Sequence, residues 1–261
     1  MGVSGALDDM LTIAKMAPMG IMIKRNIQNP GFNIITIWDQ TVAKHANKTA
    51  IIFEHRRMTF GDMDRMSNAL ARWLESLGYK SGDAMGLMLE NKPEFVCWWL
   101  AMAKLGIKVA MLNHNIKAKG LAHCIRVAHA KAVVFDSETA ANVGSVAGEL
   151  QGDGTQLLYF GGKPEGELGE MVKWISYDQV LTMDESPVPA AGRRDTIGLT
   201  DTFGYIYTSG TTGLPKAGVI THQRMCGFGL AFGALLRVNS EDVVYTCLPI
   251  FHSAGGGIGV G

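Results

Sequence analysis

Residues 205–216 read Tyr-Ile-Tyr-Thr-Ser-Gly-Thr-Thr-Gly-Leu-Pro-Lys, a strand-like run followed by a loop rich in glycine and hydroxyl groups. Gly210 and Gly213 let the backbone turn its N–H groups inward around an anion. Lys216 adds a compact positive charge on a flexible stem. Four hydroxyl side chains add hydrogen-bond donors: Thr208, Ser209, Thr211 and Thr212. The stretch therefore predicts a phosphate-binding loop at a strand end, where α/β folds usually bind ligands.

Two other interpretations of this loop were weighed against phosphate binding. The Walker A motif of kinases and GTPases places four residues between its first glycine and its Gly-Lys-Ser/Thr end. Here Gly210 and Gly213 are closer together, and Leu-Pro precedes Lys216, so that motif is excluded. A solvent-exposed hairpin turn is the structural alternative, because glycine and threonine are common in turns. The length of the whole string favours the phosphate loop.

The string resembles the phosphate loop of the adenylate-forming (AMP-binding) superfamily of acyl-CoA synthetases and luciferases, Thr-Ser-Gly-Thr-Thr-Gly-x-Pro-Lys, at every fixed position. Residues 246–255, Thr-Cys-Leu-Pro-Ile-Phe-His-Ser-Ala-Gly, are similar to a segment of the fatty acid transport proteins, also called very long-chain acyl-CoA synthetases. Four upstream stretches resemble the same subgroup in order and spacing: residues 93–96, 98–100, 103–106 and 112–113. The resemblance runs from about Ile34 to the last residue.

The resemblance implies an α/β fold, namely an incomplete N-terminal domain of the adenylate-forming fold with parallel-rich sheets flanked by helices. It implies a leader at residues 1–33 and a partial AMP-binding domain at residues 34–261. The superfamily's later segments for adenine and ribose, and its C-terminal lysine, have no match here, so no catalytic residue is assignable. The apolar glycine-rich run at residues 255–261 lacks a capping element, which also predicts truncation. We expect a fragment that is inactive alone.

The complete enzyme would use ATP to convert a fatty acid to acyl-AMP and pyrophosphate, and would then transfer the acyl group to the thiol of coenzyme A. Mg²⁺ would accompany the ATP. By resemblance, His252 lines the substrate pocket between adenylate and acyl group; the alternative is a histidine satisfied within a turn. His222 matches a common family position but is expected to serve packing or capping. The nucleotide-binding residues would be Thr208, Ser209, Gly210, Thr211, Thr212, Gly213 and Lys216.

Two further functions remain open. One is an acyl-CoA ligase for a different carboxylic acid, carnitine-like or aromatic. The other is a catalytically dead remnant that binds a nucleotide weakly or interacts with a partner. The resemblance implies peripheral association with intracellular membranes, at the endoplasmic reticulum or peroxisome in a eukaryote, or at the inner membrane or in the cytoplasm of a bacterium. The sequence predicts no oligomeric state.

The composition of the chain limits which kinds of partner and metal it is expected to bind. Lysine plus arginine and aspartate plus glutamate number 24 each, so no global field attracts nucleic acid or an anionic membrane. The 4 cysteines are widely spaced, which argues against a zinc site and a disulfide framework and favours a reducing compartment. Five histidines form no cluster with metal-ligand spacing, so no metal site is expected: His45, His55, His114, His123 and His129. No apolar run reaches the length of a membrane span.

Periodicity predicts alternating helices and strands, which favours a parallel sheet covered on both faces. Trp98 and Trp99 are expected in the core. Glycine, proline and charge at 161–169 and 183–194 predict surface loops that separate a first unit from the phosphate-binding unit. The expected helices span 34–46, 60–77, a segment opened by Pro93, 118–129 and 222–236. The expected strands span 50–53, 84–89, 107–112, 132–136, 203–207 and 217–220, with a turn at 54–57.

Overall fold

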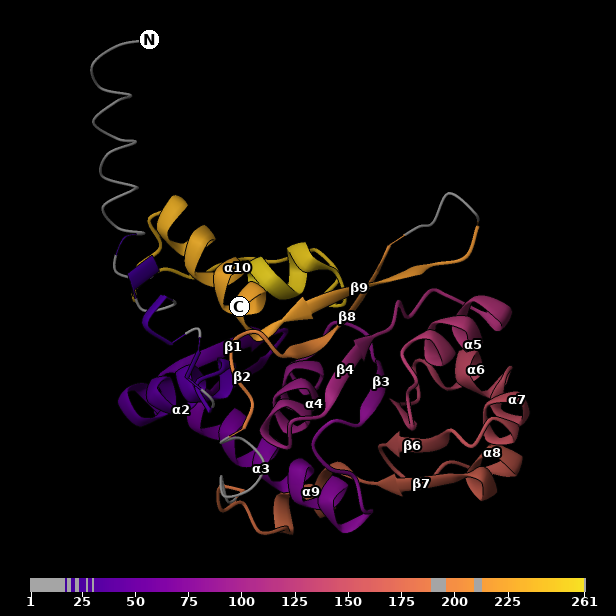
Figure 1. The fold of residues 1–261 in the computed structure, drawn as a ribbon. Coiled ribbons are helices and arrows are strands. Elements are labelled where there is room, and N and C mark those ends of the chain that lie inside the picture. The colour runs from indigo at the N-terminus through magenta and orange to yellow at the C-terminus, as the bar shows by residue number, and fades with distance from the viewer. Residues whose placement is uncertain are drawn as a thin grey trace.

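A computed structural model describes residues 17, 20–21, 24–26, 28–29, 31–188, 196–208 and 213–260. A seven-stranded sheet in the order β7-β6-β5-β3-β4-β8-β9 runs through the molecule, between α2–α4 on one side and α5–α7 on the other (Figure 1). β8 and β9 run antiparallel, and the other neighbouring strands run parallel. The expected α/β fold, with a parallel-rich sheet flanked by helices, is confirmed.

The sheet strands are β3 (Ala84–Met88), β4 (Lys108–Met111), β5 (Ala132–Phe135), β6 (Gln156–Phe160), β7 (Val172–Ile175), β8 (Thr202–Thr208) and β9 (Lys216–Thr221). A separate antiparallel pair is formed by β1 (Thr49–Phe53) and β2 (Arg56–Thr59). The helices are α2 (Ile34–His45), α3 (Phe60–Ser76), α4 (Pro93–Lys104), α5 (Ala118–Val127), α6 (Ala140–Gly144), α7 (Ala147–Gly152), α8 (Gly166–Met171), α9 (Tyr177–Thr182) and α10 (His222–Leu235). The π-helix η1 spans Ser253–Ile258.

Alternating side chains bury both faces of the sheet. Met85 and Leu87 of β3 belong to one core cluster, with α2, α3, α4, α9 and α10. Met88 of the same strand belongs to a second cluster, with α5, α6 and α7. Trp98 and Trp99 lie in the first cluster and are 0% and 3% exposed, which confirms their place in the core. Such two-sided burial is typical of parallel sheets.

Local sequence signals explain where α3 and α4 begin. Thr59 Oγ1 accepts from the Asp62 backbone N–H at 3.0 Å, and Asp62 Oδ2 accepts from the Thr59 N–H at 2.8 Å. This is a capping box, which satisfies two donors at the start of α3. Pro93 occupies the first turn of α4, where its missing N–H costs nothing. Both helix starts are therefore fixed within a few residues of their strands.

A buried lysine joins α3 to α4. Lys104 is 1% exposed, and its Nζ lies 2.7 Å from Asp64 Oδ1, 2.7 Å from Ser67 Oγ and 2.7 Å from Asn68 Oδ1. Burial alone would raise the pKa of Asp64, but the charge and hydrogen bond of Lys104 outweigh it, and the pKa is lowered. The resemblance segment at residues 103–106 thus contains a structural ion pair.

The structure corrects several expectations. The turn expected at 54–57 is shorter, because Arg56 and Arg57 pair with Phe53 and Ile52 as the start of β2. The loop expected at 161–169 ends in α8, and β6 and β7 were not predicted. β8 lies directly against β4, so one sheet holds both expected units. In the segment expected as a loop at 183–194, residues 183–188 form no helix or strand, and residues 189–194 lie outside the described residues.

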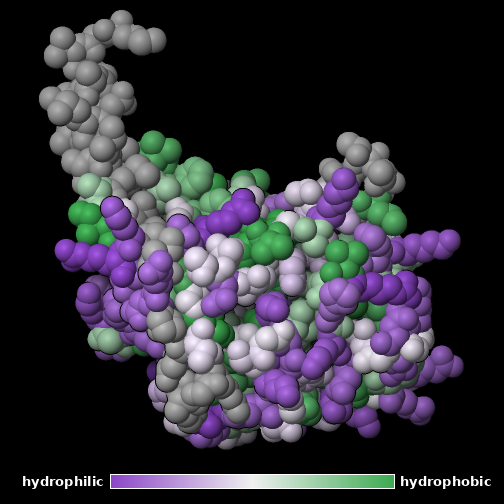
Figure 2. All heavy atoms as spheres, in the orientation of Figure 1, coloured by the Kyte–Doolittle hydropathy of each residue, from purple (hydrophilic) through white to green (hydrophobic). Residues whose placement is uncertain are grey.

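The surface is unusually apolar near the end of α10. Leu235 and Leu236 are 58% and 61% exposed, and Figure 2 shows hydrophobic atoms over this part of the molecule. Val243 and Tyr245, in the irregular stretch that follows, are 78% and 88% exposed. None of the helices within the described ranges is long and apolar enough to cross a membrane. Most of the expected leader at 1–33 lies outside the described residues.

Candidate functional site

The predicted phosphate loop joins β8 to β9 at the carboxyl edge of the parallel sheet. Thr208 ends β8 and faces Lys216, the first residue of β9, across the hairpin, and both residues are exposed. Gly213 has φ +88°, a conformation that favours glycine. Ser209, Gly210, Thr211 and Thr212 lie outside the described residues. The described ends of the loop therefore bring a hydroxyl and an ammonium group to the same place.

Helix α5 braces both arms of this hairpin. His123 Nε2 lies 3.0 Å from the carbonyl oxygen of Pro215, next to Lys216. The Tyr207 hydroxyl donates to the carbonyl of Cys124 at 2.7 Å, and burial raises the pKa of this hydroxyl, which keeps it a donor. From the sequence, His123 was noted only as one of the histidines without metal-ligand spacing, and no role was predicted for it. Its role depends on a contact between residues 92 positions apart, for which no local signal exists.

His252 stands immediately before the π-helix η1 and is exposed. Its backbone N–H donates to the Pro249 carbonyl at 3.1 Å, and its carbonyl accepts from the Gly256 N–H at 2.8 Å. Its ring lies 4.8 Å from the Phe251 ring, measured between centroids. Within the described residues, the imidazole makes no hydrogen bond, so both ring nitrogens are available to a ligand. The backbone satisfies the turn after Pro249, and the side chain remains open.

The glycines after His252 have a packing reason. A Cβ on Gly255 would meet the Pro249 carbonyl oxygen at 2.2 Å, and a Cβ on Gly256 would meet the Ile250 carbonyl oxygen at 2.4 Å. Both distances are too short for any side chain. The run expected to be uncapped is thus a π-helix that packs closely on residues 249–250, and π-helical turns are frequent at functional sites.

Asn91, in the turn between β3 and α4, contacts the same segment from its side-chain amide. Its Nδ2 donates to the Leu248 carbonyl at 2.9 Å, and its Oδ1 accepts from the Ile250 N–H at 2.9 Å. Sequence reasoning missed this residue, because a single asparagine before a helix is also a common turn residue. Its partners lie 157 and 159 positions away.

His222 is a packing residue, as expected from the sequence. It is 3% exposed, its backbone N–H donates to the Asp201 carbonyl at 3.1 Å, and its ring meets the Phe203 ring edge-on at 5.4 Å. Burial lowers the pKa of His222 to about 4, while the charge of Asp201 opposes the shift. Its Nδ1 is buried without a hydrogen-bond partner among the described residues. A neutral, enclosed imidazole of this kind is unsuited to contact substrate.

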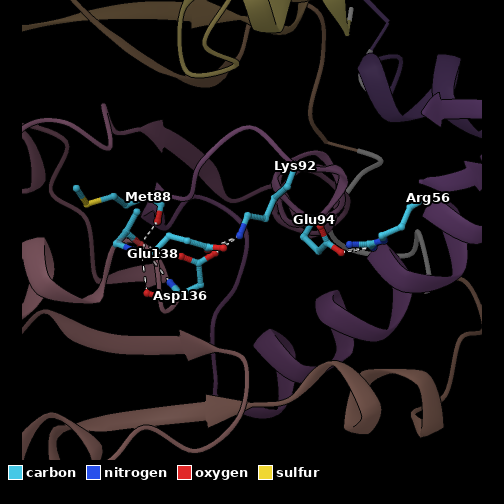
Figure 3. A network of polar contacts seen from close by, with 7 residues as sticks. Arg56, Met88, Lys92, Glu94, Asp136 and Glu138 are labelled. Carbon is cyan, nitrogen blue, oxygen red and sulfur yellow. Dashed lines mark hydrogen bonds and ion pairs between the residues drawn. The ribbon is translucent and has the colours of Figure 1, made fainter. Parts of the chain in front are cut away.

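The carboxyl ends of β3 and β5 form the switch point of the sheet, where open α/β sheets often bind ligands. Here Lys92 pairs with both Asp136 and Glu138, and Thr139 Oγ1 donates to the Met88 carbonyl at 2.8 Å (Figure 3). Burial, then the hydrogen bond with Glu138, raises the pKa of Asp136 to about 6, and Lys92 opposes the shift. The charge of Lys92 is compensated internally.

The charge of Lys216, unlike that of Lys92, is not compensated by a carboxylate among the described residues. In the described ranges Lys216 forms no ion pair, whereas Lys92 and Lys104 each face a carboxylate within 2.7 Å.

A cavity of about 400 Å³ between β2, α3 and α9 contains none of the expected site residues. Two of its guanidinium groups are paired, Arg56 with Glu94 and Arg65 with Asp62. Across the described chain, no group of three or more His, Cys, Asp or Glu side chains could hold a metal ion.

The structure places Lys216 and His252 on separate segments, and no hydrogen bond joins them in the described part of the chain. Thr208, Gly213 and Lys216 belong to the β8–β9 hairpin, and His252 belongs to the segment held by Asn91. The two segments share an end of the sheet, because Asn91 follows β3 and the hairpin loop follows β8, with β4 parallel to both strands. The candidate site is therefore this carboxyl edge.

Comparison with known proteins gives the chain a family. Human long-chain fatty acid transport protein 1 is 36% identical over 97% of this chain, which covers 38% of that protein. The medium/long-chain-fatty-acid–CoA ligase FadD6 of Mycobacterium tuberculosis is 29% identical over 95% of this chain and 38% of its own length. The chain thus spans about two fifths of these relatives.

The fold also matches a solved structure. The crystal structure of the anthranilate CoA ligase AuaEII in complex with anthranoyl-AMP superposes with a TM-score of 0.75 and 23% identity, over 87% of this chain and 42% of that one. At that identity the likeness shows a shared fold. The sequence profile of the AMP-binding enzyme family matches residues 38–260. The chain therefore belongs to the AMP-binding enzyme family.

Proposed function

We propose that this chain carries the ATP-phosphate-binding part and the acyl-side segment of an ATP-dependent long- or very long-chain fatty acyl-CoA synthetase. The observation that carries the proposal is the end of the β8–β9 hairpin, where Lys216 is exposed, forms no ion pair within the described residues, and faces Thr208 at the carboxyl edge of the sheet. The fatty acid substrate is supported by the names of two relatives, one a fatty acid transport protein and the other a fatty acid CoA ligase.

The proposed reaction has two steps. The fatty acid carboxylate attacks the α-phosphorus of ATP, an O–P bond forms, and the bond to the β-phosphate oxygen breaks to release pyrophosphate. The thiol of coenzyme A then attacks the acyl carbon, loses its proton and displaces AMP. The protein need supply no nucleophile, so its contribution is positioning and charge stabilisation. Mg²⁺ bound to the ATP phosphates would neutralise part of their negative charge.

In this scheme Lys216, Thr208, Gly213 and the loop residues 209–212 bind the β- and γ-phosphates. Lys216 carries the charge, and glycine positions in the loop let backbone N–H groups approach the phosphate oxygens. His252 donates from its free imidazole to a carbonyl or phosphate oxygen between the acyl group and the adenylate. Residues that hold adenine and ribose would come from sequence outside 1–261, because the chain spans 38% of each relative compared. Residues 34–261 would then be part of a larger domain, preceded by a leader.

Membrane association is part of the proposal. The name of one relative, a long-chain fatty acid transport protein, supports association with a membrane, and we propose that this association is peripheral and at an intracellular membrane. The exposed apolar side chains near the end of α10 are compatible with that location. Flotation of the protein with vesicles, compared between wild type and a Leu235→Ser/Leu236→Ser variant, tests it. Equal flotation of both proteins would remove this surface from the proposal.

The central test is acid-dependent exchange of pyrophosphate into ATP by the protein expressed from its complete reading frame. Lys216→Ala should lower exchange by about a hundred- to a thousand-fold, because one preorganised charged donor to the phosphates is lost. Lys173→Ala is the matched control, since Lys173 is an exposed lysine on β7 at the opposite edge of the sheet. Exchange that survives Lys216→Ala at the control level would refute the assignment.

A chain-length series defines the acid. In an apolar tunnel, each added methylene contributes up to about 0.8 kcal/mol, or about fourfold in apparent affinity, until the tunnel is full. Exchange that rises from eight to eighteen carbons supports a long-chain enzyme. Stimulation by aromatic or carnitine-like acids alone would replace the fatty acid. If no acid stimulates exchange although ATP binds, the chain is a nucleotide-binding remnant.

A further inference from the structure

The backbone just before His252 is held by two sets of contacts. In the first set, both ends of the Asn91 amide take part: Nδ2 donates to the Leu248 carbonyl and Oδ1 accepts from the Ile250 N–H, each at 2.9 Å. Bonds to residues i and i+2 along one edge copy the pairing that a neighbouring β-strand would make. In the second set, Gly255 and Gly256 approach the carbonyls of Pro249 and Ile250 so closely that no Cβ fits.

The turn that carries Asn91 is itself fixed. It follows Met88, the last residue of the central strand β3, and leads into Pro93, the buried first residue of α4. Lys92, the residue after Asn91, is paired with Asp136 and Glu138 (Figure 3). Glu94, 4% exposed, is paired with Arg56. The amide of Asn91 therefore stands at a place set by three ion pairs and by the centre of the sheet.

His252 lies two residues beyond Ile250, and its own backbone bonds run to Pro249 and Gly256. Each of these contacts stays within the segment 248–256, while the Phe251 ring packs it against the His114 ring at 5.2 Å between centroids. The Asn91 amide adds backbone hydrogen bonds from the segment to the end of β3. Without the amide, the glycine and ring contacts would remain, but the two hydrogen bonds that set the register of the segment against the strand end would be lost.

We propose that Asn91 is a positioning residue that fixes the segment carrying His252 against the ligand edge of the sheet, and that it affects the reaction through that segment. The proposal rests on the proposed function for its effect on catalysis, while its structural half stands alone. Alanine removes both bonds. Aspartate keeps the acceptor but sets a carboxylate against the Leu248 carbonyl, and glutamine is one methylene too long.

The first test is a double-mutant cycle on acid-dependent exchange, in the protein from the complete reading frame. Asn91→Ala should lower the exchange rate about tenfold in the wild-type background and less than twofold in the His252→Ala background, because coupled residues are not additive. Asn91→Asp should not rescue. Equal tenfold losses in both backgrounds, or no loss in the wild type, would overturn the proposal. A His252→Ala protein with full activity would also overturn it.

The second test needs no activity. Cys247 is exposed and adjoins Leu248, whereas Cys97, Cys124 and Cys226 are buried, so a spin label can be placed at Cys247. Asn91→Ala should narrow the label's spectrum, which reports faster motion of the segment. Gln151→Ala is the control, because Gln151 also donates an amide hydrogen bond to a backbone carbonyl, that of Met171, far from the segment. An unchanged spectrum in Asn91→Ala, with Gln151→Ala folded and equally unchanged, would overturn the clamp.

The two tests separate two failures. If the wild-type protein shows no acid-dependent exchange, the proposed function fails, and the label at Cys247 decides on Asn91 alone. If exchange occurs but Asn91→Ala leaves both the rate and the label unchanged, the clamp fails and the proposed function remains.

Discussion

The burial of His222 makes a quantitative prediction about acid stability. In the folded protein burial lowers its pKa to about 4, from an ordinary value of 6.5. As the pH falls below 6.5, the unfolded chain binds a proton that the folded protein resists. The stability that neutral His222 provides is therefore complete above pH 6.5 and is lost as the pH falls toward 4.

The size of this loss follows from the two pKa values. Proton linkage gives about 0.8 kcal/mol at pH 6, about 2 kcal/mol at pH 5 and about 3 kcal/mol at pH 4. His222→Phe removes the titrating group and keeps a ring against Phe203, which meets His222 edge-on at 5.4 Å. The variant should therefore lack this loss. Its ring also fills the site of an Nδ1 that has no described partner.

The assay is urea unfolding of both proteins at half-unit steps between pH 4 and pH 7.5. The other carboxylates and histidines titrate equally in both, so the difference between the two stability curves isolates His222. We expect that difference to change by about 3 kcal/mol across the range, most steeply near pH 5. Parallel curves, with a constant difference, would refute the assignment of a buried neutral imidazole.

Three more predictions concern other groups. Asp64→Leu leaves the buried Lys104 without its carboxylate and should cost about 3–5 kcal/mol in urea unfolding, while adding Lys104→Met should restore most of it; a double variant no better than the single one contradicts the pairing. The Asp136 carboxyl should titrate near pH 6 in carbon NMR spectra, and Glu138→Gln should move its midpoint down. Because protonated Asp136 favours the folded state, wild type should lose stability as the pH rises from about 4 to 6, and the variant should lose less. An unmoved midpoint would contradict the hydrogen bond between Asp136 and Glu138 as a cause of the raised pKa. The 261-residue chain supplied with ATP, Mg²⁺, fatty acid and coenzyme A should form no acyl-CoA, and sustained synthesis would show that it holds the complete machinery.

Much of the fold was predictable from local signals. The capping box at Thr59, the proline at the start of α4 and the apolar runs of β3, β4 and β5 each fix an element within a few residues. In these elements, the pattern of apolar side chains in the sequence predicts which residues are buried. The parallel sheet flanked by helices follows from the same alternation of strand and helix, whereas the union of both expected units in one sheet was not predicted.

Of the missed strands, β6 has an apolar run with four buried residues that was overlooked, whereas β2 and β7 lack such signals. β2 begins with two exposed arginines, so only its pairing with β1 makes it a strand. β7 has a single buried residue, Ile175, and gains its place at the sheet edge from β6. In both strands, tertiary pairing overrides weak local preference.

The residues of the candidate site also fall into those that the sequence predicts and those that it does not. Thr208, Gly213, Lys216 and His252 belong to contiguous strings, and their positions at strand and helix ends could be predicted from those strings. His123 and Asn91 could not, because each meets its partner across more than 90 residues of sequence. The glycines at 255–257 illustrate a third case. Their abundance was visible, but its cause, the close approach to residues 249–250, depends on three-dimensional packing.

The order of the strands also bears on how the molecule assembles. β3 to β7 are joined by short crossovers, whereas β4 and β8 pair residues about 95 positions apart, such as Val109 with Gly204. Closing so long a loop costs entropy before the pairing returns any free energy, so the β8–β9 hairpin is expected to dock late and to detach first. Hydrogen exchange at Ile206 and Val219 should then be faster than at Val133 in β5. If so, the phosphate loop lies on the least stable part of the sheet, and a bound polyphosphate would also complete the folding of the hairpin.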